Sequence, residues 1–357
     1  RRVYALIETG DGVPWHGQET DSGELWRSEN GGKQWQLMTH NRNLGGRQPY
    51  YTRCAVSPDD PDEVYFLATR LARTLDGGDT ASILRNAGGD HHDMWIDPAI
   101  PDRILLANDG GVHISLNRAG SWYHPDLPVA QMYHVAVDDQ VPYFVYGNRQ
   151  DGPTRRGPSN SLAGGNWHSV GGGEAGWAIP GPFDNNIVWA SNEQGVLTRY
   201  DLRTGHTTNV QVWPETPVGK SPRDIKYRWV WSYPVVVSRH SPGTLYVGSQ
   251  YVHKTADGGQ TWNEISPDLT TDDETKQVDS GGLTFDNVGV DYGTTLFAIG
   301  ESPLDPDILW AGSNDGLVHV TRDGGDSWTN VTPNGDSLPP WGTVSSIEAS
   351  RFDAGSA

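Results

Sequence analysis

Short hydrophobic runs recur along the chain, each a β-branched or aliphatic residue followed by an aromatic residue or leucine. The first residues of successive pairs are 61, 40, 41, 43, 57 and 64 residues apart. Such runs favour strands, and no long amphipathic helical stretch interrupts them. The pattern therefore predicts an all-β protein. The seven pairs are Val3-Tyr4, Val64-Tyr65, Ile104-Leu105, Val145-Tyr146, Val188-Trp189, Leu245-Tyr246 and Leu309-Trp310.

A polar phrase, Ser/Thr-x-Asp/Asn-Gly-Gly-x-x-Trp, follows several of these pairs. Complete copies begin at Ser28, Thr255 and Thr321, and altered copies begin at Thr74 and Ser115. The glycines supply the positive φ angles of a tight hairpin, and the acid or amide can accept hydrogen bonds from its own turn. The tryptophan can pack over the turn. We expect a structural role for Ser28, Asn30, Trp35, Thr74, Asp76, Ser115, Asn117, Trp122, Thr255, Asp257, Trp262, Thr321, Asp323 and Trp328.

Corners rich in proline and aspartate precede several of the hydrophobic pairs, as at residues 57–62, 97–102 and 302–307. A period near 40 residues with short strands and glycine-rich turns is typical of a β-propeller blade. With strands a to d in each blade, the corner joins a to b and the Asp-Gly-Gly turn joins c to d. We therefore predict a single seven-bladed β-propeller over residues 1–357, which begins and ends at the same phase of the repeat.

Composition narrows the classes of partner. The formal net charge is −19, whereas nucleic-acid binding needs a basic surface, so we expect no nucleic-acid partner. No apolar run is long enough to cross a bilayer. Cys54 is the single cysteine, so the chain can form no internal disulfide.

The Asp-Gly-Gly turns resemble the Asp-box, also called the bacterial neuraminidase repeat. Residues 88–98, 171–176 and 310–325 are similar to a bacterial group of large secreted proteins described as sortilin-like or glycosyl-hydrolase-like, among them xyloglucanase-type two-propeller enzymes. The resemblance implies a propeller that works outside the cytoplasm. The sequence opens on a strand without methionine, so we expect a mature, trimmed or partial chain. Because members of that group are typically longer, the resemblance implies a fragment of a larger, two-propeller protein. Sialidase activity is not expected, since the Phe/Tyr-Arg-Ile-Pro phrase of that family is absent near the start.

The predicted topology places the b–c and d–a loops on one face, around the central channel. Length varies mostly in this set, in residues 17–24, 39–53, 212–233 and 267–293, and long loops on a rigid scaffold commonly carry binding sites. We expect polar residues of these loops to converge near one mouth of the channel. The candidate ligand-binding residues are His91, His92, Asp109, Gln150, Glu193, Trp213 and Asp315.

Glu174 stands in a glycine-rich d–a loop and is the most suggestive single carboxylate. General acid catalysis would need a second carboxylate at about 5–10 Å, and Asp151 or Asp109 could supply it. Residues 90–93, Asp-His-His-Asp, could ligate a metal, but alternation along a strand turns half of them away from any one ion. A hydrogen-bond network between blades is the preferred interpretation. We predict no metal or cofactor, and Ca²⁺ in the channel stays open.

Aromatic residues gather in residues 226–233, where alternation predicts a strand with Tyr227, Trp229, Trp231 and Tyr233 on one face. Packing between blades is preferred over sugar stacking for this stripe. The two blades without a regular Asp-Gly-Gly turn border Gln150, Asp151 and Glu174, and such departures are more common at functional sites.

Three functions stay open, of which the weakest is a structural or assembly subunit bound to a membrane complex. The preferred one is an extracytoplasmic, sortilin-like module that binds a protein or peptide partner within a larger assembly. The alternative is a glycoside hydrolase, or half of one, that acts on a polysaccharide through a carboxylate pair. Whether the chain is an enzyme is therefore undecided by its sequence. Two carboxylates facing each other across an aromatic-lined groove would favour the hydrolase.

Overall fold

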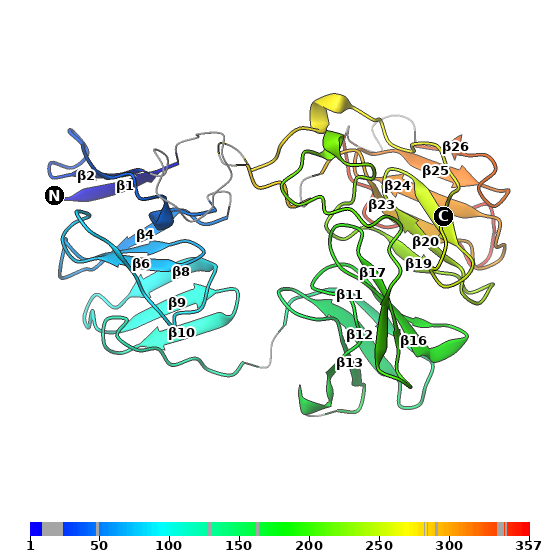
Figure 1. Cartoon of the computed structure of the whole chain (residues 1–357), viewed down its shortest axis with the longest axis horizontal. Coiled ribbons are helices and arrows are strands. Elements are labelled where there is room, and N and C mark those ends of the chain that lie inside the picture. The colour runs from blue at the N-terminus through cyan, green and yellow to red at the C-terminus, as the bar shows by residue number, and fades with distance from the viewer. Residues whose placement is uncertain are drawn as a thin grey trace. The chain divides into compact units, whose positions relative to one another are not determined.

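A computed structural model describes residues 1–8, 24–47, 50–127, 130–161, 164–281, 283, 285–289, 292–333, 339 and 341–357. The described chain forms seven antiparallel sheets of three or four strands, which confirms the all-β class (Figure 1). Helix in the described residues is confined to four three-residue 3₁₀ turns, η1 (Arg42–Leu44), η2 (Gly164–Asn166), η3 (Pro222–Asp224) and η4 (Glu274–Lys276). No helix among the described residues is long and apolar enough to span a bilayer.

The chain divides into two compact units. Unit 1 comprises Arg1–Pro128 with Ser280–Asp286, and unit 2 comprises Val129–Asp279 with Asn287–Ala357. The single-ring prediction therefore stays a prediction. Part of one predicted long loop, residues 17–23, lies outside the described residues.

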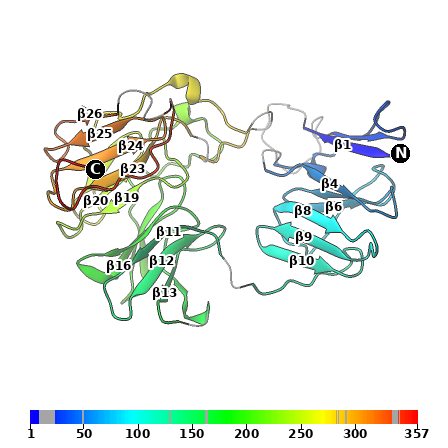
Figure 2. The ribbon, with the colours of Figure 1, turned by 180° about the vertical axis from the view of Figure 1, so that it is seen from behind.

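Unit 1 holds three sheets, coloured blue to cyan in Figure 1. Its first sheet has three strands, β1 (Val3–Ile7), β2 (Glu24–Ser28) and β3 (Gln36–Thr39). The second sheet has four, β4 (Arg53–Val56), β5 (Val64–Leu67), β6 (Leu71–Thr74) and β7 (Ser82–Ile83). The third sheet is β8 (His91–Ile96), β9 (Ile104–Asn108) and β10 (Gly111–Ser115), which lie side by side in Figures 1 and 2.

Unit 2 holds four sheets of four strands each. The first is β11 (Met132–Val137), β12 (Phe144–Arg149), β13 (Arg155–Pro158) and β14 (His168–Ser169). The second is β15 (Ala178–Gly181), β16 (Asp184–Ser191), β17 (Leu197–Asp201) and β18 (His206–Asn209). The third is β19 (Val235–Val237), β20 (Leu245–Gly248), β21 (Val252–Thr255) and β22 (Asn263–Glu264). The fourth is β23 (Leu296–Glu301), β24 (Leu309–Ser313), β25 (Val318–Thr321) and β26 (Thr329–Asn330).

In several sheets the second strand is buried along its whole length. In β5 all four residues are buried, and in β24 all five are. Core clusters join consecutive sheets: Tyr146 of β12 packs with Ala178 and Val188 of the next sheet. The recurring hydrophobic pairs therefore fill the space between neighbouring sheets of the same unit.

The turn between β21 and β22 shows how the polar phrase is used locally. The Thr255 hydroxyl donates to Asp257 Oδ1 at 2.7 Å and accepts from the backbone N–H of Gly259 at 3.0 Å. The same Asp257 oxygen accepts from the N–H of Thr261, and Trp262 donates its indole N–H to the Val210 carbonyl of the preceding sheet at 2.8 Å. The bonds of Trp262 and Trp328 each tie one sheet to the one before it.

Two expectations about local structure are wrong. Residues 226–233 form no strand, because their backbone is held by side chains instead: Arg228 N–H donates to Gln250 Oε1 at 2.9 Å. Tyr227 and Trp229 are buried in a core cluster, in line with the preferred packing role. His91 and His92 lie in the first strand of their sheet, β8, and not in the loop before it.

Candidate functional site

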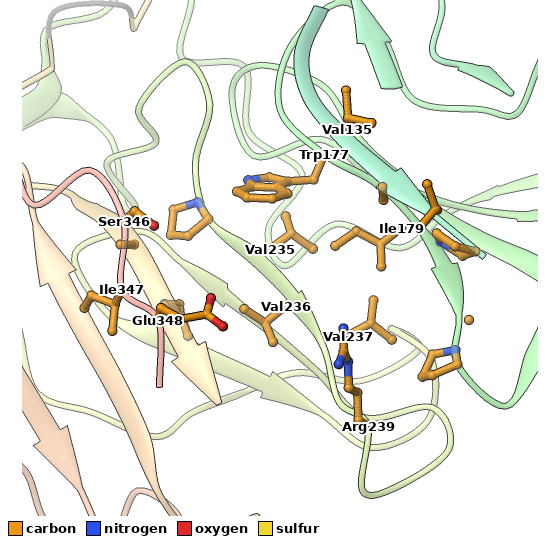
Figure 3. Close-up of a pocket in the computed structure, with 18 of the residues that line it drawn as sticks. Val135, Trp177, Ile179, Val235, Val236, Val237, Arg239, Ser346, Ile347 and Glu348 are labelled. Carbon is orange, nitrogen blue, oxygen red and sulfur yellow. The ribbon is translucent and has the colours of Figure 1, made fainter. Parts of the chain in front are cut away.

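A groove of about 650 Å³ lies in unit 2 (Figure 3). Its lining comes from the first strand of each of the four sheets, β11, β15, β19 and β23, and from a C-terminal segment, residues 345–348. Apolar side chains dominate, with Val135, Trp177, Ile179, Val237 and Ile347 on different walls. These residues are absent from the sequence-based candidates.

The four lining strands stand at the edges of their sheets, since each is bonded on one side only in the described sheet order. An edge strand carries backbone N–H and C=O groups that have no strand partner on the outer side. Val135 and Val137 of β11 are 65% and 55% exposed, although both are apolar. The groove therefore combines apolar side chains with unpaired main-chain groups.

Close approach of the C-terminal segment depends on Gly312 in β24. A Cβ atom at this position would come within 2.4 Å of Val344 Cγ1, and the Val344 N–H donates to the Ser313 carbonyl at 3.0 Å. The missing side chain thus admits residues 344–347 against β24, and this contact places Ile347 in the groove wall.

The predicted carboxylates gather where β11 begins, beside the groove. Glu174 Oε2 accepts from the side-chain amide of Gln150 at 2.8 Å and from the backbone N–H of Asp151 at 3.1 Å. The same Gln150 amide nitrogen donates to Asp151 Oδ1 at 3.1 Å, so the two bonded carboxylate oxygens lie no more than about 6 Å apart. Three b–c and d–a loop residues therefore converge as the sequence led us to expect.

Burial sets the protonation of this cluster. Burial, aided by the nearby Glu193 charge, raises the pKa of Glu174 to about 7, against the opposing hydrogen bond from the Asp151 backbone. Burial also raises the pKa of Glu193, whose Oε2 finds no hydrogen-bond partner among the described residues. Near neutral pH the cluster therefore holds a carboxyl group that can exchange a proton.

Tyr133 and Trp231 complete the cluster, and sequence reasoning missed the tyrosine. The Trp231 indole N–H donates to the Tyr133 hydroxyl at 2.8 Å, and that hydroxyl donates to Gln150 Oε1. Tyr133 lies on β11 two residues before the groove-lining Val135, and His134 between them stacks on Trp177 with ring centroids 3.6 Å apart. The register of β11 shifts between Met132 and Val135, so simple alternation could not have identified Tyr133. Strand β11 thus contributes Tyr133 to the carboxylate cluster and Val135 to the groove lining.

The predicted histidine group lies in unit 1. His91 is buried, with no hydrogen-bond partner for either ring nitrogen in the part of the chain that the structure describes. His92 Nε2 contacts Asp109 Oδ1 at 2.5 Å, and the pair is partly exposed. The register between β8 and β9 shifts between His91 and Asp93, so this stretch departs from simple alternation. Because Glu174 belongs to unit 2, a shared channel mouth stays a prediction.

Asp315 and Trp213 occupy different settings. Buried Asp315 accepts from the backbone and the hydroxyl of Thr271, at 2.7 and 2.8 Å, and so fastens the loop after Asp268. Trp213 is 44% exposed, with the Lys226 ammonium 4.1 Å from its ring centroid. Of the two, only Trp213 is presented to solvent for a contact.

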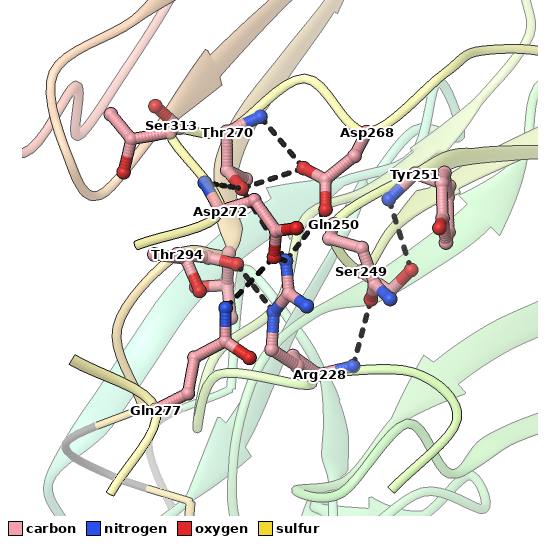
Figure 4. Close-up of polar contacts among 12 residues, drawn as sticks. Arg228, Ser249, Gln250, Tyr251, Asp268, Thr270, Asp272, Gln277, Thr294 and Ser313 are labelled. Carbon is pink, nitrogen blue, oxygen red and sulfur yellow. Dashed lines mark hydrogen bonds and ion pairs between the residues drawn. The ribbon is translucent and has the colours of Figure 1, made fainter. Parts of the chain in front are cut away.

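A buried arginine anchors the same long loop (Figure 4). Arg228 donates to Asp268 Oδ2 at 2.7 Å and to the Thr294 carbonyl at 2.9 Å, and it pairs with Asp272 at 3.2 Å. These partners engage Nε and one terminal nitrogen of the guanidinium. Much of predicted loop 267–293 is therefore held against the scaffold, and the arginine is a structural group.

Among the described residues, no group of three or more His, Cys, Asp or Glu side chains has the geometry to hold a metal ion. In the Asp-His-His-Asp run, His91 is buried and His92 and Asp93 are exposed. The cluster beside β11 consists of carboxylate, amide and aromatic side chains.

No family model and no curated protein matches the chain. Among solved structures, a GH74 enzyme of Niastella koreensis is 12% identical, with a TM-score of 0.29 over 93% of this chain. A GH74 xyloglucanase of Xanthomonas campestris is 14% identical, with a TM-score of 0.27 over 95% of this chain and 70% of that one. YCF48 bound to D1 peptide is 14% identical, with a TM-score of 0.32 over 79% of this chain and 81% of that one. The chain spans 64% of the Niastella enzyme. These likenesses include enzymes and a peptide-bound protein, so they favour neither activity.

Proposed function

We propose that the chain is a peptide-binding β-propeller module whose groove receives an extended segment of a protein partner. The observation that carries this proposal is the lining of the groove by four edge strands, β11, β15, β19 and β23. Unpaired backbone groups can bond the main chain of an extended peptide, and apolar pockets can take alternate side chains. Val135, Ile179 and Val237 supply apolar surface for such side chains.

Charge selects the kind of peptide. The groove lining includes Asp138, Asp139 and Glu348 but a single basic residue, Arg239. Since the whole chain carries a formal net charge of −19, a basic segment is attracted both at long range and in the groove. The proposed ligand is therefore an extended peptide in which apolar residues alternate with lysine or arginine.

The same proposal includes the finer architecture, in which the seven sheets are the blades of one ring with Asp-box turns. It also places the module outside the cytoplasm. Its support is the repeated corner, strand pair and turn in successive sheets. A compact 357-residue domain has an expected radius of gyration of about 21 Å. Small-angle X-ray scattering should give that value, whereas a clearly larger radius would show two separated units.

Binding can be tested with a synthetic library of decapeptides that alternate apolar and basic residues, screened by fluorescence anisotropy. We expect binding that V135K reduces at least tenfold, because a lysine there adds bulk and positive charge to the groove. The matched control is V218K, which adds the same residue at a 48% exposed valine outside the groove lining. Equal binding by wild type and V135K would contradict the groove as the site.

A second candidate function is supported by the carboxylate pair. A separation of about 5–5.5 Å is that of a retaining glycoside hydrolase, and the Glu174–Asp151 geometry allows it. The raised pKa suits Glu174 as the acid, which leaves Asp151 as the nucleophile. Both side chains are tied to the same Gln150 amide and do not face each other across the groove, so this function ranks second.

A polysaccharide-hydrolysis screen of wild type beside E174Q separates the two functions. Product release that E174Q abolishes would establish the hydrolase and identify its acid. Peptide binding without release of any product would support the module. Because E174Q leaves the groove strands intact, loss of peptide binding in E174Q alone would instead extend the peptide site to the carboxylate cluster.

A further inference from the structure

A second cavity, of about 220 Å³, lies between two consecutive sheets of unit 2, β15–β18 and β19–β22. Phe183, Trp189 and Arg199 come from the first sheet and its hairpin. The second sheet supplies the Pro242–Gly243 corner and the Asp257–Gly258 turn. The cavity therefore has an aromatic wall, a cation and a floor of turn backbone.

Arg199 is the unusual member of this lining. It lies on β17 opposite Trp189 of β16 and is partly buried. Within the described residues its guanidinium makes no hydrogen bond or ion pair. A partly buried guanidinium normally has a partner, because withdrawing it from water is costly.

Arginines in unit 1 show what this position does elsewhere. Arg27 of β2 donates to the Gly77 carbonyl in the turn of the next sheet at 2.8 Å. Arg73 of β6 likewise donates to the Arg118 carbonyl of the next sheet at 2.9 Å. In both cases the cation fastens a sheet to the following turn.

At β15–β18 a different side chain makes this bond. Trp189 donates its indole N–H to the Gly258 carbonyl at 3.3 Å. Trp189 therefore makes the bond between the two sheets in place of Arg199. The N–H donors of Arg199 face the cavity.

Three carboxylates near Arg199 are already engaged. Asp201, whose pKa is lowered by its hydrogen bonds with Arg203 and also by the Arg199 charge, pairs with Arg203 at 2.9 Å. Asp257 accepts bonds from Thr255, Gln260 and Thr261 of its own turn. Asp184 accepts from Asn186 and lies 3.2 Å from Arg203. Because these carboxylates are engaged, Arg199 is free to bind an anion. Their negative charge disfavours an anion that carries two negative charges.

We propose that this cavity binds a singly charged carboxylate carried on an apolar group about as large as a leucine or phenylalanine side chain. The guanidinium fork pairs with the carboxylate through two parallel hydrogen bonds. Phe183 and Trp189 cover the apolar group. The ligand could be a free small acid or the C-terminal carboxylate of a chain that ends in an apolar residue.

The first test uses the wild-type chain. Ligand-observed NMR should detect binding of N-acetyl-leucine, with N-acetyl-leucinamide at least tenfold weaker because it lacks the charge. Inorganic phosphate should compete poorly. Equal binding of acid and amide, or no binding of either at millimolar concentration, would overturn the proposal.

A variant then assigns the binding to Arg199. R199Q should lose at least tenfold in affinity for N-acetyl-leucine. The control R322Q removes the same charge from an exposed arginine outside the cavity and should bind as wild type. Unchanged binding by R199Q would contradict the site, and if R199Q fails to fold, the acid–amide comparison on wild type still decides.

The two sources of the carboxylate are separated by a third comparison. Peptides ending in leucine are tested with a free and with an amidated C-terminus, beside N-acetyl-leucine. Binding of the free-ended peptide shows that a chain terminus can be the ligand. Binding of the small acid alone restricts the site to small molecules, and both results support the proposed chemistry.

Discussion

The indole N–H of Trp231 donates to the hydroxyl of Tyr133 at 2.8 Å, across 98 residues of sequence. Through Gln150 the same hydroxyl reaches the Glu174 carboxyl. The irregular segment before β19, the first strand of the third sheet of unit 2, is thereby joined to the Glu174 carboxyl. Glu174 itself precedes β15, the first strand of the second sheet. This connection makes the protonation of Glu174 a property of the surrounding fold as well as of its own loop.

Glu174 should make stability depend on pH near neutrality. Because its pKa is raised by folding, the folded state holds the proton more tightly, and this contribution is full below about pH 4.5 and lost as pH rises through about 7. E174Q keeps a neutral side chain and should be more stable than wild type at pH 8 by about 1 kcal/mol, allowing for partial exposure. Urea unfolding at pH 5 and pH 8 measures the difference. A constant gap at both pH values would contradict the raised pKa.

His91 should make unit 1 sensitive to mild acid. Burial lowers its pKa to about 4, so the unfolded state binds a proton more readily, and stability is lost as pH falls from about 6.5 towards 4. Between pH 7 and pH 5 we expect a loss of about 2 kcal/mol in unit 1. Hydrogen exchange of β8–β10 at the two pH values measures it. H91L, which cannot be protonated, should remove most of the dependence, and an unchanged dependence in H91L would assign it elsewhere.

The tryptophan bonds between sheets should be measurable one at a time. Trp328 donates to the Ile265 carbonyl of the preceding sheet at 2.7 Å, and W328F removes this bond while keeping an aromatic ring. We expect a loss of about 1 kcal/mol in unfolding free energy. Trp35 donates to Gly32 within its own turn and is 41% exposed, so W35F is the matched control and should lose less. Equal losses of unfolding free energy in W328F and W35F would show that the inter-sheet hydrogen bond adds no stability of its own.

Gly312 should control the wall of the groove. A methyl group there collides with Val344, so G312A should displace the C-terminal segment and weaken library peptides several-fold. Limited proteolysis should cleave G312A faster near residues 344–350 than wild type. G165A is the control, because no atom lies within 4 Å of its added methyl group. Normal binding with rapid cleavage would show that this segment is not part of the peptide site.

The sequence predicted the carboxylate cluster better than the groove. Gln150, Asp151 and Glu174 stand in loops of the kind that the repeat assigns to one face, so their proximity follows from the period alone. The groove depends on the edges of four strands from separate sheets, and Val135 or Ile179 looks like any other strand residue in the sequence. Local pattern cannot show which edge is left without a partner.

The error at residues 226–233 has a related cause. Alternating aromatic residues predict a strand, but Arg228 draws this backbone to Gln250 and Thr294, which are distant in sequence. Tertiary hydrogen bonds overrode the local preference. The expected burial of Tyr227 and Trp229 held nevertheless, because burial follows from side-chain chemistry whatever the backbone does.

Each strand of the described sheets pairs with a neighbour along the chain, in the order in which the chain presents them. A sheet such as β15–β18 therefore closes short loops and needs no distant segment to pair its strands. Contacts of low sequence separation favour fast folding, and arrays in which each part touches the next tend to grow stepwise. As the chain emerges during synthesis, one sheet can form and then serve as the packing surface for the following one.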